Sequence, residues 1–197
     1  LEERKEQKNF SKLADSLTPL AKGMNSEYCN QNTYDAIQIH GGSGFMMDYP
    51  IQRYYRDARI TSIYEGTTQL QVVAAIRYVT NGSYLAQARE FEQAEVSEAM
   101  KPLVARAKAM ADKLEEATAR VKEAGDAAFH DICARHLVEM AADVIMLHLL
   151  IHNATANAEL FEKSARVYAN FSEAEVAKHH TFVMNLRPED LADYVQA

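Results

Sequence analysis

The pattern of apolar and polar positions is helical along most of this chain. Runs of alternating Val, Ile and Thr, which would mark strands, are absent, and glycine and proline number only 7 and 4. Apolar residues instead recur at steps of three and four, the spacing of one face of an α-helix. The pattern therefore predicts an all-α fold built from helical bundles.

In the first part of the chain the pattern predicts helices at three places: 10–40, 52–59 and 67–80. Residues 10–40 form one or two helices, with Pro19 at a start or a kink because proline lacks the helical N–H donor. The glycine-rich segment 41–50 (GGSGFMMDYP) is predicted to be a loop. Asn81 and Gly82 suit the left-handed residue that ends a helix.

The second part of the chain carries a heptad stripe, which predicts a long helix in an antiparallel bundle. The stripe consists of Val96, Met100, Leu103, Ala107, Met110, Leu114, Ala117 and Val121. Further helices are predicted over 126–153, over 157–171, from a capping box at Ser172 and Glu175, and in a short final piece at Pro188. We therefore divide the chain into 1–83, part of a helical domain, and 84–197, a helical extension.

Charge and composition exclude some function classes. The chain has 197 residues and a net charge of −7, which argues against a general nucleic-acid-binding protein. The most apolar run, 141–151, is too short for a membrane span, so no transmembrane helix is predicted. Cys29 and Cys133 lie far apart without a CxxC partner, which favours a reducing, cytoplasmic location.

The segment 54–71 (YYRDARITSIYEGTTQLQ) is the strongest candidate for chemistry. It places a lone acid, Glu65, before Gly66, where a ligand could approach the backbone closely. Thr67 and Thr68 can cap the helix that follows, whose free N–H groups suit a polar oxygen. Taken alone, Glu65 is better interpreted as a solvated acid near a helix start, stabilised by the helix dipole. Gly41, Gly42 and Gly44 have no preceding strand, so they are not a dinucleotide fingerprint.

The order and spacing of motifs from Asp35 to Gln71 resemble the C-terminal helical domain of acyl-CoA dehydrogenases. The matching pieces are QIHGG-G at 38–44, YP at 49–50, RDARI at 56–60 and IYEGT-Q at 63–69. The resemblance continues more weakly upstream to about residue 14. It implies that the chain is part of a longer flavin enzyme that oxidises an acyl-CoA thioester to the trans-2-enoyl-CoA.

The resemblance also implies roles for individual residues. Glu65 corresponds to the general base that removes the proton next to the thioester carbonyl, and its backbone N–H helps hold the thioester oxygen. Tyr64 and Gly66 would line the substrate site, in a cleft that excludes water. Arg56 and Asp57 are expected to have a structural role, such as a buried ion pair or a cap. The expected contacts to the cofactor FAD come from Thr67 and Gln69, and from Gln38, Gly41 and Gly42 toward a neighbouring subunit.

The resemblance implies partners as well. An acyl-CoA is the substrate, an electron-transferring flavoprotein is the expected electron acceptor, and the protein is expected to be a homo-oligomer, a dimer or a tetramer. The isolated chain is expected to be inactive, because the family's other domains hold much of the flavin and the substrate. An acyl-CoA oxidase, or a non-catalytic helical scaffold on the same fold, stays open as an alternative.

The extension 84–197 resembles the extra helical domain of larger bacterial acyl-CoA dehydrogenases. Its histidines are not interpreted as metal ligands. His136 and His148 fall on the apolar stripe of a predicted helix, which favours satisfied core or subunit-contact histidines.

Overall fold

The computed structural model describes residues 2–192, and all regular secondary structure within that range is helical, as predicted. This part of the chain divides into two compact units, one up to Ala75 and one from Ile76 on. The boundary lies inside α4, whereas the sequence predicts a division after residue 83. The elements are α1 (Glu2–His40), α2 (Gly42–Phe45), α3 (Ile51–Thr61), α4 (Thr68–Thr80), α5 (Ser83–Glu92), α6 (Lys101–Ala124), α7 (Ala127–Ala156), α8 (Ala158–Asn185) and the 3-10 helix η1 (Pro188–Leu191).

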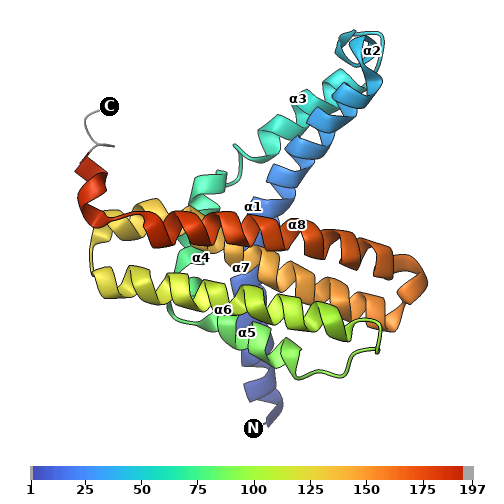
Figure 1. The fold of residues 1–197 in the computed structure, drawn as a ribbon. Helices are drawn as coiled ribbons and strands as arrows, with labels where there is room; N and C mark the ends of the chain where they lie inside the picture. The colour runs from blue at the N-terminus through green and yellow to red at the C-terminus, as the bar shows by residue number, and fades with distance from the viewer. Residues whose placement is uncertain (1, 193–197) are drawn as a thin grey trace. The chain divides into compact units, whose positions relative to one another are not determined.

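In the first unit, α3 packs against the second half of α1, and the turn that joins them contains α2 (Figure 1). The predicted loop 41–50 therefore includes one short helix. Gly44, which is buried, makes this turn possible: a Cβ there would lie 2.6 Å from the carbonyl oxygen of Ile37. A glycine is needed because the backbone of the turn lies directly on the end of α1.

Helix α1 continues through Pro19 without a break, so the alternative of two separate helices is wrong. Hydroxyl groups bond to carbonyls in the turn before the proline. Ser16 donates to the carbonyl of Leu13 and Thr18 to that of Ala14, each at 2.8 Å. Side-chain donors of this kind help a helix accommodate a proline.

The expected ion pair or cap at Arg56 and Asp57 is not found. Both side chains are exposed on α3, and neither is bonded to any residue within 2–192. They lie on the polar side of α3, where water solvates both charges at little cost.

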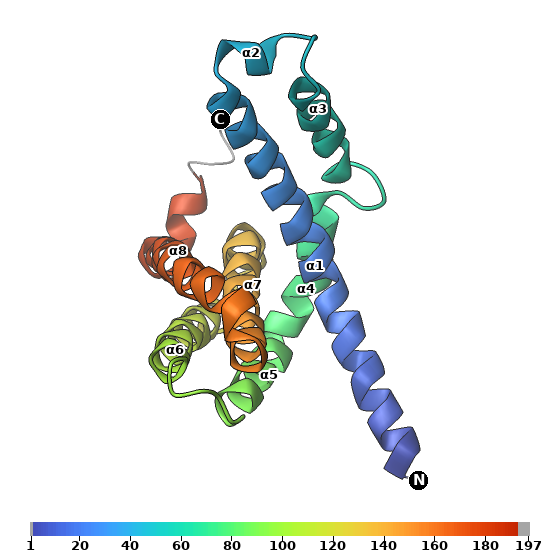
Figure 2. The ribbon, with the colours of Figure 1, turned by 90° about the vertical axis from the view of Figure 1, so that its right-hand side faces the viewer.

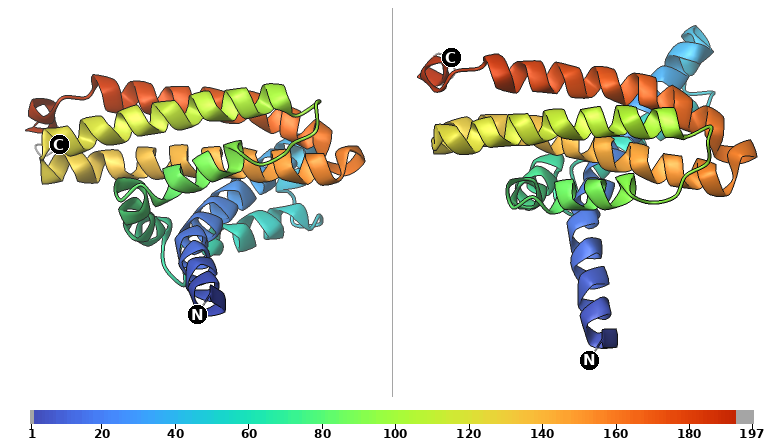
Figure 3. Two further views of the ribbon diagram at one scale, coloured as in Figure 1. Left: turned by 90° about the horizontal axis from the view of Figure 1, so that it is seen from below. Right: turned by 60° about the horizontal axis from the view of Figure 1, so that its bottom comes forward.

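The second unit is a bundle in which α6, α7 and α8 pack against one another and α5 packs against α6 and α7. Figure 2 looks along the three long helices, and Figure 3 shows them side by side. Seven of the eight residues of the predicted heptad stripe, from Met100 to Val121, are buried in this core. Val96 lies outside the helix, because α6 begins at Lys101 with Pro102 in its first turn, the position where proline is tolerated.

Two boundaries in this unit differ from the prediction. Helix α5 was not predicted as a separate element. The predicted helix start at Ser172 is wrong, because Ser172 lies in the middle of α8 and its hydroxyl donates to the carbonyl of Tyr168 at 2.8 Å. A serine can make this bond inside a helix, so its presence alone does not identify a start. The cap of α8 is Asn157, whose side chain accepts from the N–H of Leu160.

Helix α7 is long and apolar enough to cross a membrane, with 67% of its most apolar window buried inside the unit. The core helix of a bundle has the same composition, because neighbouring helices cover it on several sides. We interpret α7 as the central core helix of this unit, although it is longer than the apolar run 141–151 on which the prediction of no membrane span is based.

Among the buried polar side chains of this core, His148 is unusual. It is only 1% exposed, and neither ring nitrogen has a hydrogen-bond partner among the residues that the structure describes. The ring of Phe91 lies 5.8 Å from that of His148 and 5.2 Å from that of His152, centroid to centroid. Burial, with smaller effects from His152 and Arg89, lowers the pKa of His148 to about 4. His148 is therefore a core histidine, one of the two predicted alternatives, but its ring nitrogens are not satisfied within the described residues.

We expect His148 to make the bundle sensitive to acid. Its pKa is lower in the folded than in the unfolded state, so its neutral form supports stability above pH 6.5, and this contribution is lost as the pH falls toward about 4. Replacement by leucine removes the buried nitrogens. His148→Leu should raise the free energy of unfolding by about 1–3 kcal/mol near neutral pH and flatten its pH dependence. Thermal unfolding of the chain across this pH range measures both effects.

The matched control is His130→Leu, since His130 lies at the start of α7 and its side chain is partly exposed. The same pH dependence in the parent chain and in His148→Leu would contradict the expectation.

Candidate functional site

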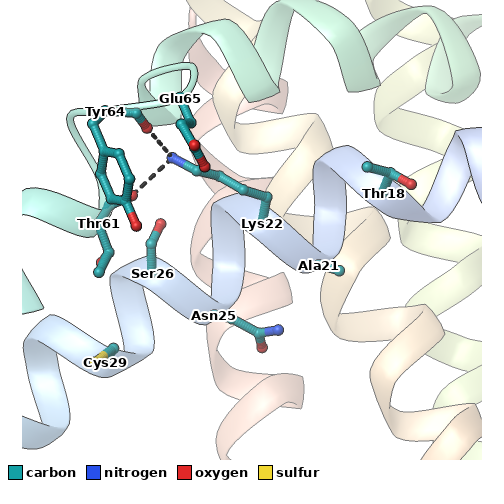
Figure 4. A pocket seen from close by; sticks show the side chains of 9 residues that line it. All are labelled: Thr18, Ala21, Lys22, Asn25, Ser26, Cys29, Thr61, Tyr64 and Glu65. Carbon is teal, nitrogen blue, oxygen red and sulfur yellow. Dashed lines mark hydrogen bonds between the residues drawn. The ribbon is translucent and has the colours of Figure 1, made fainter.

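The predicted base lies in a groove of the first unit with a volume of about 560 Å³ (Figure 4). One wall is a face of α1, and the other is the turn between α3 and α4. Helix α1 contributes Thr18, Lys22, Ser26 and Cys29. Their steps of four, four and three place them on one face of the helix. The turn contributes Tyr64 and Glu65, so two of the predicted site residues line the same groove.

The backbone of the turn is left-handed at two consecutive residues. Glu65 has φ 51°, the one positive φ of a non-glycine residue within 2–192, and Gly66 has φ 89°. L-residues adopt this region rarely because the Cβ crowds the following carbonyl. A non-glycine residue there is held in place by its surroundings and often marks a functional position.

The polar groups of the turn are available to a ligand. The backbone N–H groups of Glu65, Gly66 and Thr67 have no acceptor within the described chain. The carboxylate of Glu65 has neither an ion pair nor a hydrogen bond within the described chain. Glu65 is exposed, so the expected dry cleft is not formed by this chain alone.

Helix α1 anchors this turn through polar side chains that the sequence analysis did not identify. Lys22 donates to three carbonyls of the turn. Glu27 accepts from the hydroxyl of Thr68 at 2.6 Å, and Asn30 donates to the carbonyl of Ala58 at 3.2 Å. Lys22, Ser26 and Asn30 are four residues apart, so this polar face of α1 was visible in the sequence as a helical period.

The predicted cofactor contacts lie in two places. Thr67 directly precedes α4 and Gln69 lies in its first turn, and the Thr67 hydroxyl accepts from the N–H of Leu70 at 3.2 Å. Gln38 lies near the C-terminal end of α1, about 24 Å along the helix from Lys22, and Gly41 and Gly42 follow directly after that end. One groove cannot contain both sets.

The residues of both places fit such a cofactor. Gln38 and Gln69 are exposed with amide donors and acceptors free for a ring or a phosphate. A Cβ built at Gly41 or Gly42 would meet nothing within 4 Å, so a flat or charged group can approach the backbone there. Large apolar side chains of the turn 41–50, between α1 and α3, are exposed, among them Phe45 at 82% and Met47 at 88%.

Two histidines of the second unit, His136 and His179, form a largely buried polar cluster with Glu139. The Nδ1 atoms of His136 and His179 lie 2.8 Å apart, and Nε2 of His179 lies 3.0 Å from Glu139. Burial opposes ionisation of Glu139, but hydrogen bonds from His179 and Arg135 outweigh it and lower the pKa of Glu139 to about 2. Within 2–192, no group of three or more His, Cys, Asp and Glu residues is arranged to hold a metal.

Two family profiles match the chain almost end to end. "Acyl-CoA dehydrogenase, C-terminal domain" matches residues 3–78, and "Acyl-CoA dehydrogenase C terminal" matches residues 80–191. The chain belongs to the acyl-CoA dehydrogenase family. The second profile covers the bundle, so the extension is a family domain in its own right.

Curated relatives match about a third of the chain. A broad-specificity linear acyl-CoA dehydrogenase of Mycobacterium tuberculosis is 48% identical over 60 residues, 30% of this chain and 10% of the relative. The caffeyl-CoA reductase-Etf complex subunit CarC of Acetobacterium woodii is 47% identical over 64 residues, 32% of this chain and 16% of the relative. The chain therefore spans only a small part of these proteins.

Solved structures support the same assignment. An acyl-CoA dehydrogenase family protein from Porphyromonas gingivalis is 38% identical with a TM-score of 0.55, and the match covers 58% of this chain and 99% of the other. An acyl-CoA dehydrogenase from Bacillus anthracis, complexed with FAD, has a TM-score of 0.66 over 84% of this chain and 32% of the other. At 19% identity the second shows the fold only.

The left-handed turn predicts a cost for a side chain at Gly66. A Cβ there would lie 2.6 Å from Nε2 of Gln71, which donates to the Gly66 carbonyl at 3.3 Å. Gln71 can swing away, but the φ of 89° stays unfavourable. Gly66→Ala should therefore lower the free energy of unfolding by about 1–2 kcal/mol, measured by thermal unfolding.

Gly42→Ala is the control, because its new Cβ meets nothing and its φ is not in the positive range. Equal stability losses in the two variants would show that the left-handed turn is not the cause.

Proposed function

We propose that this chain is the C-terminal part of an FAD-dependent acyl-CoA dehydrogenase, which oxidises an acyl-CoA thioester to the trans-2-enoyl-CoA. The observation that carries the proposal is the free carboxylate of Glu65 beside a row of unpaired backbone N–H groups at the groove. A base and an oxyanion site on one turn suit proton removal next to a carbonyl.

Glu65 acts in two ways in this proposal. Its carboxylate takes the proton from the carbon next to the thioester carbonyl. Its backbone N–H donates to the thioester oxygen, where negative charge develops as the proton leaves. Because both groups belong to one residue, the left-handed backbone sets their mutual geometry. Gly66 leaves space for the thioester, and Tyr64 borders the groove.

FAD, when bound, accepts the hydride from the neighbouring carbon. Thr67 and Gln69 would hold it next to Glu65, since Thr67 directly precedes α4 and Gln69 lies in its first turn. Gln38, Gly41 and Gly42 would contact the cofactor of a second subunit. The large apolar side chains exposed in the turn 41–50 support a homo-oligomer, because exposed apolar patches of this kind mark contact surfaces.

We further propose an electron-transferring flavoprotein as the electron acceptor. The Acetobacterium woodii relative is named as part of a complex with such a protein, Etf. Its name also describes a reductase, so the assay is run in both directions, with an acyl-CoA and a dye or with an enoyl-CoA and a reduced donor.

The test of the base is Glu65→Gln in the full-length protein, assayed by acyl-CoA-dependent dye reduction. The amide keeps the size of the side chain but cannot take the proton. The rate should fall by a factor of about 10²–10⁴, with FAD content unchanged. Glu123→Gln, an exposed acid at the end of α6, is the control. Undiminished dye reduction in Glu65→Gln would refute the assignment of the base.

Other outcomes separate the alternatives. Acyl-CoA-dependent peroxide formation without a dye would identify an oxidase. A full-length protein that assembles stably but contains no FAD would identify a helical scaffold.

The isolated 197-residue chain should neither retain FAD nor turn over an acyl-CoA. The described residues leave Glu65 exposed, and the predicted cofactor contacts lie in two separate places. Flavin absorbance after gel filtration and the dye assay measure the two properties. A yellow, active preparation of these residues alone would contradict the expectation.

A further inference from the structure

Three hydrogen bonds tie Lys22 of α1 to the turn that carries Glu65. Its ammonium donates to the carbonyl of Thr61 at 2.8 Å, Tyr64 at 3.2 Å and Gly66 at 2.5 Å. Figure 4 shows two of these bonds. A lysine ammonium has three N–H donors, so backbone carbonyls use its full donor capacity.

The three carbonyls surround the left-handed position. Those of Tyr64 and Gly66 belong to the residues immediately before and after Glu65. A residue at positive φ keeps that conformation only when its neighbours hold it there. The Tyr64 carbonyl belongs to the peptide unit that precedes Glu65, and the Gly66 carbonyl to the unit that follows Gly66, so one cation restrains both ends of the left-handed pair Glu65–Gly66.

A cation is well suited to this place. Thr61 is the last residue of α3, where helix carbonyls lack intrahelical partners and the helix dipole is negative. Lys22 is half-buried, so its three acceptors replace much of the water around its charge. Among the remaining side chains of the groove, none can offer three donors to three carbonyls from one atom.

Lys22 acts on the backbone and does not pair with the base. Within the described residues there is no ion pair between Lys22 and the carboxylate of Glu65. With its three N–H groups engaged, the lysine has none left for the carboxylate or for a substrate. The carboxylate stays free to accept a proton.

We propose that Lys22 is a positioning residue for the base: it holds the turn 61–66 so that the Glu65 carboxylate and backbone N–H face the groove together. This inference rests on the proposed function for its catalytic consequence, but its structural part stands apart from it. Loss of the ammonium should release the turn and misplace both groups, while the rest of the first unit stays folded.

The first measurement concerns the turn itself, in the full-length protein. Lys22→Met keeps the length of the side chain and removes the charge and the donors. Amide hydrogen exchange in 61–68 should become at least tenfold faster, and a crystal structure should show Glu65 outside the positive-φ region. Lys12→Met, an exposed lysine on the same helix, is the control and should leave the exchange unchanged.

The second measurement concerns the reaction. In Lys22→Met, kcat for acyl-CoA-dependent dye reduction should fall by about 10–100-fold, because small misplacements of a base are costly, while KM and FAD content change less than about threefold. Lys22→Ala should show a similar loss, which n-propylammonium, the missing end of the side chain, should partly reverse. Potassium chloride at the same ionic strength should not.

The outcomes are distinct. An unchanged turn in Lys22→Met overturns the inference, whatever the activity, and so does a released turn with an unchanged kcat. Loss of kcat without rescue by the amine, or with an equal loss of bound FAD, also overturns it, since that is the result of a general folding role. A parent protein inactive toward acyl-CoA, with the turn released in Lys22→Met, refutes the proposed function and leaves the positioning of Glu65 standing.

Discussion

The candidate site depends on one backbone constraint, the left-handed conformation of Glu65 and Gly66 between two helices. An ordinary turn would continue α3 or join the helices with its N–H groups bonded internally. Here Glu65 and Gly66 have positive φ, so the N–H groups of residues 65–67 stay free and the Glu65 carboxylate lies beside them. Side chains of α1 hold this geometry from outside, which makes the long first helix part of the site.

The second unit follows different rules. Its core comes from regular apolar stripes on α6, α7 and α8, with many alanines, so the helices approach closely and need few special contacts. Its buried polar groups are exceptions within this regularity. His136, His179 and Glu139 satisfy one another, whereas His148 has no partner in the described chain. The match of a separate family profile to residues 80–191 agrees with a core that forms independently.

Much of the fold was predictable because helical periodicity is a local property. The stripe from Met100 to Val121 identified the buried face of α6, and Gly125 marked its end. The errors concern residues whose local signal has two meanings. Ser172 has the composition of a cap but bonds back inside α8, and Pro19 lacks a helical donor but α1 continues through it. The helix propensity of a single residue cannot separate these cases, because packing against neighbouring helices decides which conformation forms.

The motif from Tyr64 to Gln69 identified the turn and its acid from the sequence, because residue types and spacing are enough to carry a family pattern. The part played by α1 could not be read in the same way. Lys22 and Glu65 are 43 positions apart, and no periodic pattern connects them. That a lysine ammonium meets three carbonyls of a turn, and that the carboxylate of this turn is left without a partner, follows from how α1 and α3 pack. Contacts between distant segments depend on the three-dimensional arrangement of the helices, which the spacing of residues along the chain does not determine.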